Sequence, residues 1–271
     1  MTTTSRLPSP SSYSLDTGWH AERERLASLT RLYDATTLRL CDQLNIGPGA
    51  ACLELGAGTG TVAEALAERV APGGLVIATD TDTRFLEPLA TGALRVETAD
   101  VTVGLPEGQF NLVHARLLLE HLPQRLEVLQ LMASAAAPGG WVLVEDFDWS
   151  GAVMVDPPTP LLSRVANACR TFMESHGYDP EFGRRLPRAL AQAGLVDIGT
   201  HAQAMPVYAD PQRGVPQWEL LVAQLGPALL AAGLLRQHHL DAFADLCHDG
   251  ITVFFAPVMV SCWGRRPAPG S

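Results

Sequence analysis

The sequence contains no lysine: all 19 basic residues among its 271 are arginines. Without a lysine amine the protein cannot form a Schiff base with a carbonyl substrate or with pyridoxal phosphate, and it has no P-loop lysine to hold a phosphate. The positive charges are also outnumbered: 29 Asp and Glu residues give a formal net charge of −10. An acidic surface repels phosphate backbones and anionic lipid. We therefore expect neither nucleic acid nor a membrane as a partner.

Cysteines and long apolar runs are few. The five cysteines are scattered, with no CxxC pair, which indicates reduced thiols and predicts a cytoplasmic location instead of a disulfide frame or a zinc site. Residues 1–14 have no apolar core, so no secretory signal is predicted. The longest uncharged stretch, 220–235, contains Gly226, Pro227 and Gly233 and is too short to cross a bilayer. The apolar content, 47%, is enough for one large domain.

Between residues 50 and 146, short apolar runs alternate with helical patterns. The five strand candidates are residues 51–55, 75–79, 94–97, 110–114 and 141–145. This alternation predicts crossover units and a doubly wound α/β fold, in which helices cover both faces of a mostly parallel sheet. Beyond residue 147 we expect four helices (160–175, 180–194, 216–232 and 234–247) and two extended segments (195–208 and 251–263).

Five regions are predicted along the chain: a disordered tail (1–12), an N-terminal helical lid (13–45), a nucleotide-binding domain (46–208 and 249–264), a helical insertion (209–248) and a C-terminal tail (265–271). The lid carries Tyr13, Trp19 and Tyr33, which could close over a ligand. The insertion is rich in Leu and Ala. It fits either a roof over an apolar small molecule or a packing or dimer surface, so a homodimer is left open.

The most informative segment is Glu54-Leu55-Gly56-Ala57-Gly58-Thr59-Gly60. It follows a predicted strand and opens a predicted helix, which is the context of a nucleotide-binding loop. Gly56 permits the tight turn, Gly58 lets a ligand approach the backbone, and Gly60 lets the helix pack close to the strand. Taken alone, such a loop could be an ordinary strand-to-helix turn.

Acidic residues at neighbouring strand ends favour the nucleotide interpretation. Asp80 ends the second strand, where a carboxylate can accept hydrogen bonds from ribose hydroxyls, and Asp100 follows the third. The fourth strand ends in His114-Ala115-Arg116 at the same edge of the sheet. The loop has ExGxGxG spacing, whereas dinucleotide-binding loops have GxGxxG. Acidic groups around the pocket suit a ligand with ammonium, sulfonium and hydroxyl groups better than one with two phosphates.

Residues 53–60, 78–80, 99–101, 110–113 and 138–140 together resemble the class I S-adenosylmethionine-dependent methyltransferases, over about residues 30–146. The resemblance implies a seven-stranded, Rossmann-like sheet whose last strand is antiparallel, with the extended segments 195–208 and 251–263 as strands six and seven. It also implies S-adenosylmethionine as cofactor. It assigns Gly56 and Gly58 to the methionine part of the cofactor, Asp80 to the ribose, Asp100 and Val101 to the adenine, and Ala115 and Arg116 to the methionine and sulfonium end. Further cofactor-binding candidates are Glu54, Ala57, Gly60 and Thr81.

Such an enzyme transfers methyl by in-line displacement, which requires alignment of acceptor and methyl and needs a base only for a protonated acceptor. We expect a small-molecule acceptor, with oxygen ahead of nitrogen or carbon. No Asn-Pro-Pro-Tyr-type tetrapeptide follows the fourth strand, which disfavours methylation of nucleic acid bases or glutamine amides. Two alternatives are cofactor binding without methyl transfer (cyclisation, decarboxylation or hydroxylation) and an NAD-dependent oxidoreductase, which the loop spacing disfavours.

Three residues near the active edge are candidates for catalysis: His114, His121 and Asp146. His121 could instead cap a helix. Arg116 could simply pair with Glu120, four residues on. The acidic and aromatic segment 145–149 fits either substrate binding or a solvated loop with one buried aromatic.

The candidates for an acceptor pocket are Tyr13, Phe147, His176, Tyr178 and Arg184. No metal is expected. The neighbours His238 and His239 diverge by about 100° on a helix, and Cys247-His248 has no carboxylate or histidine at ligand spacing.

Overall fold

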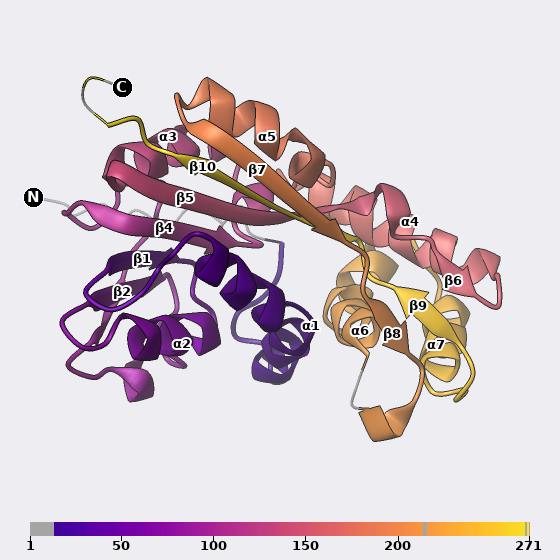
Figure 1. The fold of residues 1–271 in the computed structure, drawn as a ribbon. Helices are drawn as coiled ribbons and strands as arrows, with labels where there is room; N and C mark the ends of the chain where they lie inside the picture. Colours follow the sequence, from indigo (N-terminus) through magenta and orange to yellow (C-terminus); the bar gives the residue numbers. More distant parts are fainter. Residues whose placement is uncertain (1–13, 214–215, 269, 271) are drawn as a thin grey trace, which may run out of the picture.

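The structure is a computed structural model that describes residues 14–213, 216–268 and 270. Its main feature is a seven-stranded sheet with the order β3-β2-β1-β4-β5-β10-β7 (Figure 1). The strands are β1 Ala51–Leu55, β2 Leu75–Asp80, β3 Leu94–Thr98, β4 Phe110–Arg116, β5 Ala136–Asp148, β7 Val196–Gln203 and β10 Val258–Arg265. The pairs from β3 to β5 are parallel, and β10 is antiparallel to both of its neighbours. The predicted doubly wound, mostly parallel sheet is confirmed.

Helices cover both faces of this sheet, which is why its central strands are apolar throughout. The helices α1 (Glu22–Gln43) and α2 (Thr61–Val70) lie on one face, and α3 (Arg125–Ala135) and α5 (Phe182–Gln192) lie on the other (Figure 1). In α2, the apolar positions Val62, Leu66 and Val70 fall on one side and are buried against the strands. Both layers leave the carboxyl ends of the parallel strands open, where doubly wound proteins bind ligands.

A smaller lobe lies where β7 ends and β10 begins (Figure 1). It contains an antiparallel sheet, order β6-β9-β8, and three helices. Their bounds are β6 Val155–Asp156, β8 Pro206–Tyr208, β9 Val253–Phe255, α4 Pro160–Glu174, α6 Gln217–Ala231 and α7 Gln237–Cys247.

The small sheet corrects the prediction for the two extended segments. Residues 195–208 divide into β7 and β8, and residues 251–263 divide into β9 and β10, so each segment serves both sheets. The physical reason lies in two prolines: Pro206 begins β8 and Pro257 separates β9 from β10. Proline has no N–H to donate to a ladder, so a continuous strand cannot pass through these positions in the middle of a sheet.

Four short 3₁₀ helices complete the described secondary structure: η1 Glu87–Leu89, η2 Leu119–His121, η3 Trp149–Gly151 and η4 Pro211–Arg213. The expectation of a solvated loop after the fifth strand is wrong, because β5 continues to Asp148 and Trp149 opens η3 in the interior.

The core of the small lobe joins it to the N-terminal helix. Buried side chains of α4, α6 and α7 form one apolar cluster with Tyr33 of α1 and Phe147 of β5. Most of the insertion's apolar surface is therefore internal packing, and only Gln217 and Leu221 of α6 reach the cavity described below. Among the described residues, none of the helices is both long enough and apolar enough to cross a membrane.

Candidate functional site

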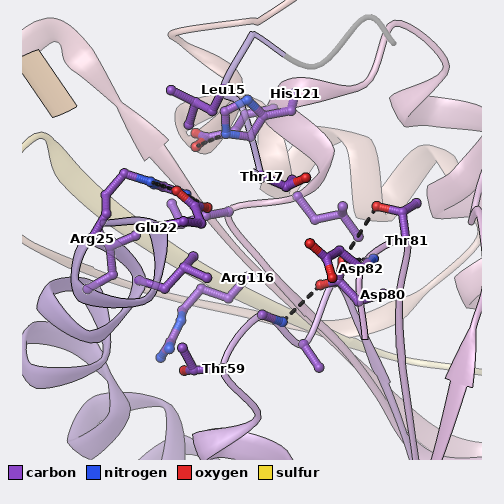
Figure 2. Close-up of a pocket in the computed structure, with 18 of the residues that line it drawn as sticks. Leu15, Thr17, Glu22, Arg25, Thr59, Asp80, Thr81, Asp82, Arg116 and His121 are labelled. Carbon is purple, nitrogen blue, oxygen red and sulfur yellow. Dashed lines mark hydrogen bonds and ion pairs between the residues drawn. The ribbon is translucent and has the colours of Figure 1, made fainter. Parts of the chain in front are cut away.

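A cavity of about 780 Å³ opens at the carboxyl ends of the strands, between helix α1, the glycine loop and the small lobe (Figure 2). This volume lies in the range of small-ligand sites. One half is formed by the glycine loop and the acidic strand ends. The other half is formed mainly by apolar and aromatic side chains, among them Leu29, Leu117, Phe147, Trp149, Met173, Tyr178 and Leu221.

The glycine loop adopts a backbone that favours glycine. Gly56, Gly58 and Gly60 have φ values of +65°, +57° and +81°, in the left-handed region. A Cβ at Gly58 would meet only Leu26 of α1, at 3.7 Å, so the loop backbone there is open to a ligand. A Cβ at Gly60 would approach Leu86 and Leu89 to within 2.7 Å. Gly60 therefore serves close packing and does not line the cavity.

Carboxylates surround the same half of the cavity. Asp80 accepts a hydrogen bond from the N–H of Gly58 at 2.9 Å and another from the N–H of Asp82 at 3.0 Å, and Figure 2 shows these acidic residues side by side with Thr81. Asp100 accepts from the N–H of Thr102 at 2.9 Å. Asp100 and its neighbour Val101 both line the cavity. The arrangement offers acceptors to hydroxyl and amino groups and repels phosphate.

Aromatic side chains form the opposite half. Trp149 donates its indole N–H to the hydroxyl of Tyr178 at 2.7 Å. The ring of Tyr178 lies 4.8 Å from the ring of His121. On α1, Arg25 forms two hydrogen bonds with Glu22, of 2.8 and 2.6 Å, and Figure 2 shows this pair at the same end of the pocket as His121. Because each charge there has an opposite charge beside it, this half suits a ligand with an apolar body.

His121 and Glu120 are the titratable neighbours in this half. Burial, together with the positive charges of Arg25 and Arg125, lowers the pKa of His121 to about 3. Burial raises the pKa of Glu120 to about 8, against the opposing effect of a hydrogen bond from the N–H of Phe147. The His121 Nε2 atom lies 3.7 Å from Glu120 Oε1. At neutral pH the imidazole is therefore uncharged, and the carboxyl group is mostly protonated.

The structure brings most of the predicted cofactor residues, and three further candidates, to this one cavity. Those lining it are Glu54, Gly56, Ala57, Gly58, Asp80, Thr81, Asp100, Val101, Arg116, His121, Phe147 and Tyr178. Arg116 does not pair with Glu120 as one interpretation had it, but with Asp34 of α1, at 2.6 Å. His121 ends η2 at the cavity wall.

Other predicted residues lie away from the cavity lining: Gly60, His114, Ala115, Asp146, His176 and Arg184. Ala115 is buried in β4 and Asp146 in β5, and the Oδ2 atom of Asp146 has no hydrogen bond to any described residue. The Nδ1 atom of His176 lies 2.9 Å from the carbonyl oxygen of Phe172, and the guanidinium of Arg184 donates a 2.7 Å hydrogen bond to Asp148. Tyr13 lies outside the described residues. For His176 and Arg184 the structure thus shows local partners instead of the expected pocket.

Sequence reasoning missed four residues that two helices contribute to the site. Glu22, Arg25 and Leu26 of α1 and Gln217 of α6 line the cavity, although none was a candidate. The aromatic residues Trp19 and Tyr33 of the predicted lid are not part of the lining, and closure of this segment over a ligand stays a prediction. A helical pattern tells which residues are apolar, and it does not tell which turn of a helix will lie over a distant loop.

Comparison with known proteins agrees with this geometry. Residues 20–201 match a family described as a methyltransferase domain. The methyltransferase str2 of Strobilurus tenacellus is 31% identical over 194 residues, covering 68% of this chain and 70% of the relative, and the str3 methyltransferase of the same organism is 30% identical over 172 residues, covering 62% and 61%.

The chain belongs to the S-adenosylmethionine-dependent methyltransferases. Solved structures share the fold of this methyltransferase at low identity. The YcgJ protein of Bacillus subtilis superposes with a TM-score of 0.56 at 15% identity, covering 87% of this chain and 99% of that one. A phosphoethanolamine N-methyltransferase of Haemonchus contortus, solved with S-adenosyl-L-methionine, gives 0.52 at 15% identity, covering 90% and 52%.

The cofactor of this methyltransferase family fits the residues on the acidic side of the cavity. The open backbone at Gly58 leaves room that a Cβ would fill, and the carboxylates of Glu54, Asp80 and Asp100 line the space around it. A group that carries an ammonium, a sulfonium, two ribose hydroxyls and an adenine amine matches such a set of acceptors. Among the described residues no cluster with metal-ligand spacing is present.

Proposed function

We propose that this methyltransferase transfers a methyl group to an oxygen atom of a small molecule that binds in the aromatic half of the cavity. The observation that carries the proposal is the continuity of the cavity: the same space is lined by Gly58 and Asp80 at one end and by His121 and Trp149 at the other. Cofactor and acceptor can therefore share one volume, in which the methyl group and the acceptor oxygen can be brought into line.

On the cofactor side, each residue has a distinct task. We expect Asp80 to accept hydrogen bonds from the ribose hydroxyls, because it ends β2 at the carboxyl edge of the sheet. Asp100 and Val101 form the wall where the adenine amine and ring would rest, and Glu54 faces the amino-acid part. Gly56 and Gly58 allow close approach of that part to the backbone.

When bound, S-adenosylmethionine supplies a methyl group on a sulfonium, and the acceptor oxygen's lone pair forms the new O–C bond as the S–C bond breaks and its electrons return to sulfur. The chain's own task is to hold the acceptor and take its proton. We propose that His121 accepts this proton, because its imidazole is uncharged and lines the acceptor half. A low pKa suffices, because a hydroxyl becomes a very strong acid once its oxygen has gained a methyl group.

The lining of the acceptor half indicates the kind of small molecule. Phe147, Trp149 and Met173 offer apolar contact, and the positive charge of Arg25 is already matched by Glu22. Gln217 is buried, and its Oε1 atom has no hydrogen-bond partner among the residues that the structure describes. These features support an uncharged acceptor with an apolar or aromatic body, a hydroxyl near His121 and a polar group within reach of Gln217.

The test is product mass. We would incubate the purified protein with S-adenosylmethionine and a panel of small uncharged phenols and alcohols, and analyse the mixture by mass spectrometry. The proposal predicts a product heavier than its acceptor by one methylene, about 14 Da, together with S-adenosylhomocysteine. His121→Asn should lose most of the turnover, whereas the matched variant His176→Asn, away from the cavity, should not. A product of altered mass without the added methyl would favour cofactor use without methyl transfer.

The five cysteines bear on where the enzyme works. All five are buried and free, and burial raises the pKa of the Cys52 and Cys169 thiols to about 12. Unpaired thiols in this number suit a reducing compartment, so we place the enzyme in the cytoplasm. Labelling with a thiol reagent under denaturing conditions, without prior reduction, should modify all five.

A further inference from the structure

Behind the glycine loop, His114 lies between two carboxylates. Its Nδ1 atom is 2.6 Å from Glu54 Oε2 and its Nε2 atom is 3.1 Å from Glu145 Oε2. The ring is fully buried and does not line the cavity. It joins the ends of three neighbouring strands, because Glu54 is on β1, His114 on β4 and Glu145 on β5. No step of the proposed reaction uses it.

The charges in this cluster are well defined. Burial opposes protonation of His114, but the negative charge of Glu54 and hydrogen bonds to both carboxylates raise its pKa to about 9. Burial likewise opposes the charge on Glu145, yet the hydrogen bond and charge of His114, with smaller contributions from Arg116 and Ser261, lower the pKa of that carboxyl to about 2. At neutral pH one imidazolium, that of His114, therefore lies between the carboxylates of Glu54 and Glu145 and contacts both. The three groups together carry one net negative charge.

The described groups packed around the cluster are hydroxyls, thiols and, further out, an arginine with its own carboxylate partner. From α1, Thr37 donates a 2.5 Å hydrogen bond to Glu145, and from β10 Ser261 donates one of the same length. The nearby thiols of Cys41 on α1 and Cys52 on β1 stay protonated, because burial raises the pKa of each. Further out, Arg69 of α2 acts on both thiols and its guanidinium pairs with Asp42.

The same cluster holds helix α1 in place. Thr37 also accepts a 2.9 Å hydrogen bond from Arg116, whose other nitrogen binds Asp34 one turn earlier on the helix. Two turns further toward the N-terminus, Leu26 lies over Gly58. A continuous path of polar contacts therefore runs from Glu54 through His114 and Glu145 to the helix that covers the cofactor side of the cavity.

We propose that His114 is a positioning residue, which fixes the Glu54 carboxylate toward the ammonium group of the cofactor's methionine part and ties that contact to helix α1. The inference rests on the proposed cofactor site. Glu54 lines the cavity, and its Oε2 atom is engaged by His114, so its second oxygen is the one available to a ligand. A bound ammonium brings the cluster to neutrality.

Removal of His114 has a specific consequence. Without the imidazole, the Glu54 carboxylate loses the 2.6 Å hydrogen bond that orients it and its link to Glu145. A Glu54 side chain that is no longer held in place is a poorer acceptor for an ammonium. The loss of binding affinity in a His114 variant should therefore depend on whether the ligand carries the amino-acid part.

Two ligands separate this role from a general loss of structure. S-adenosylhomocysteine carries the ammonium group, whereas 5′-methylthioadenosine has the same nucleoside and sulfur without the amino-acid part. We would titrate both into the wild type, His114→Gln and the control His176→Gln by calorimetry at pH 7. The expected result for His114→Gln is a Kd at least tenfold higher for S-adenosylhomocysteine and less than threefold higher for 5′-methylthioadenosine, with the control unchanged.

The Thr37→Val variant, of nearly the same shape, tests the tie to α1 and remains informative if His114→Gln does not fold. It removes the hydroxyl that bonds to both Glu145 and Arg116. We expect the Kd for S-adenosylhomocysteine to rise several-fold and the Kd for 5′-methylthioadenosine to stay the same. If the folded variants lose affinity equally for both ligands, or lose none, the inference is overturned. If the wild type binds neither ligand, it is the proposed cofactor site that fails.

Discussion

The backbone N–H of Gly58 donates a 2.9 Å hydrogen bond to the carboxylate of Asp80. One carboxylate thereby fixes the glycine loop and faces the cavity as the proposed ribose acceptor. We expect Asp80→Ala to raise the Kd for S-adenosylhomocysteine by about 100-fold or more, because two hydrogen bonds to a charged group are worth about 1.5–3 kcal/mol each. Calorimetry measures this effect. The exposed variant Asp245→Ala is the control, and equal affinities for all three proteins would contradict the assignment.

Gly58 and Gly73 provide a matched pair for the role of the bare backbone. Both have positive φ, +57° and +86°, and a Cβ at Gly73 meets nothing within 4 Å. Gly58→Ala and Gly73→Ala should each cost about 1 kcal/mol of stability from the backbone conformation alone. Only Gly58→Ala should weaken S-adenosylhomocysteine binding, by at least tenfold. Similar affinities for the two variants would show that the ligand does not approach this backbone.

Much of the fold follows from local signals in the sequence. The helix predicted at 160–175 is observed as α4, Pro160–Glu174, because Thr159 accepts a hydrogen bond from the N–H of Leu161 as N-cap and Pro160 occupies the first turn. The glycine loop and the acidic strand ends were predictable for a similar reason. Each belongs to a short segment whose spacing fixes its place at one edge of the sheet.

What could not be predicted depends on contacts far apart in the chain. The small antiparallel sheet pairs β8 with β9, and no short segment specifies that pairing. Likewise, His114 lies near the end of β4 as expected, but its position between Glu54 and Glu145 requires three strands to be in register. The contribution of Glu22 and Arg25 to the site depends on how α1 crosses the glycine loop, which sequence periodicity does not determine.

The pH dependence of turnover tests the role of His121. Because burial and two arginines lower its pKa to about 3, the imidazole stays uncharged well below neutral pH. With an acceptor from the panel that is turned over, we expect titration of His121 to leave kcat unchanged between pH 8 and 5.5. A catalytic histidine with an ordinary pKa near 6.5 would instead lower kcat about tenfold over this range. A loss of that size, absent from the residual activity of His121→Asn, would contradict the assignment.

Stability as a function of pH tests the state of Glu120. Burial raises its pKa from 4.5 to about 8, so between these values the folded protein holds a proton that the unfolded chain has released. The free energy of unfolding should therefore fall as pH rises through this window, by on the order of 1 kcal/mol per unit. Glu120→Gln cannot ionise and should lose this contribution. Urea unfolding of both proteins from pH 5.5 to 8 measures the difference, and parallel curves would show that Glu120 ionises normally.

The central claim is that the acidic half of the cavity holds the nucleoside and the aromatic half holds the acceptor. A crystal structure with S-adenosylhomocysteine tests it most directly. The account predicts the ribose on Asp80, the adenine beside Asp100 and Val101, and the sulfur facing the half lined by His121, Tyr178 and Trp149. A ligand whose adenine occupies that aromatic half, or whose sulfur faces away from it, would contradict the account.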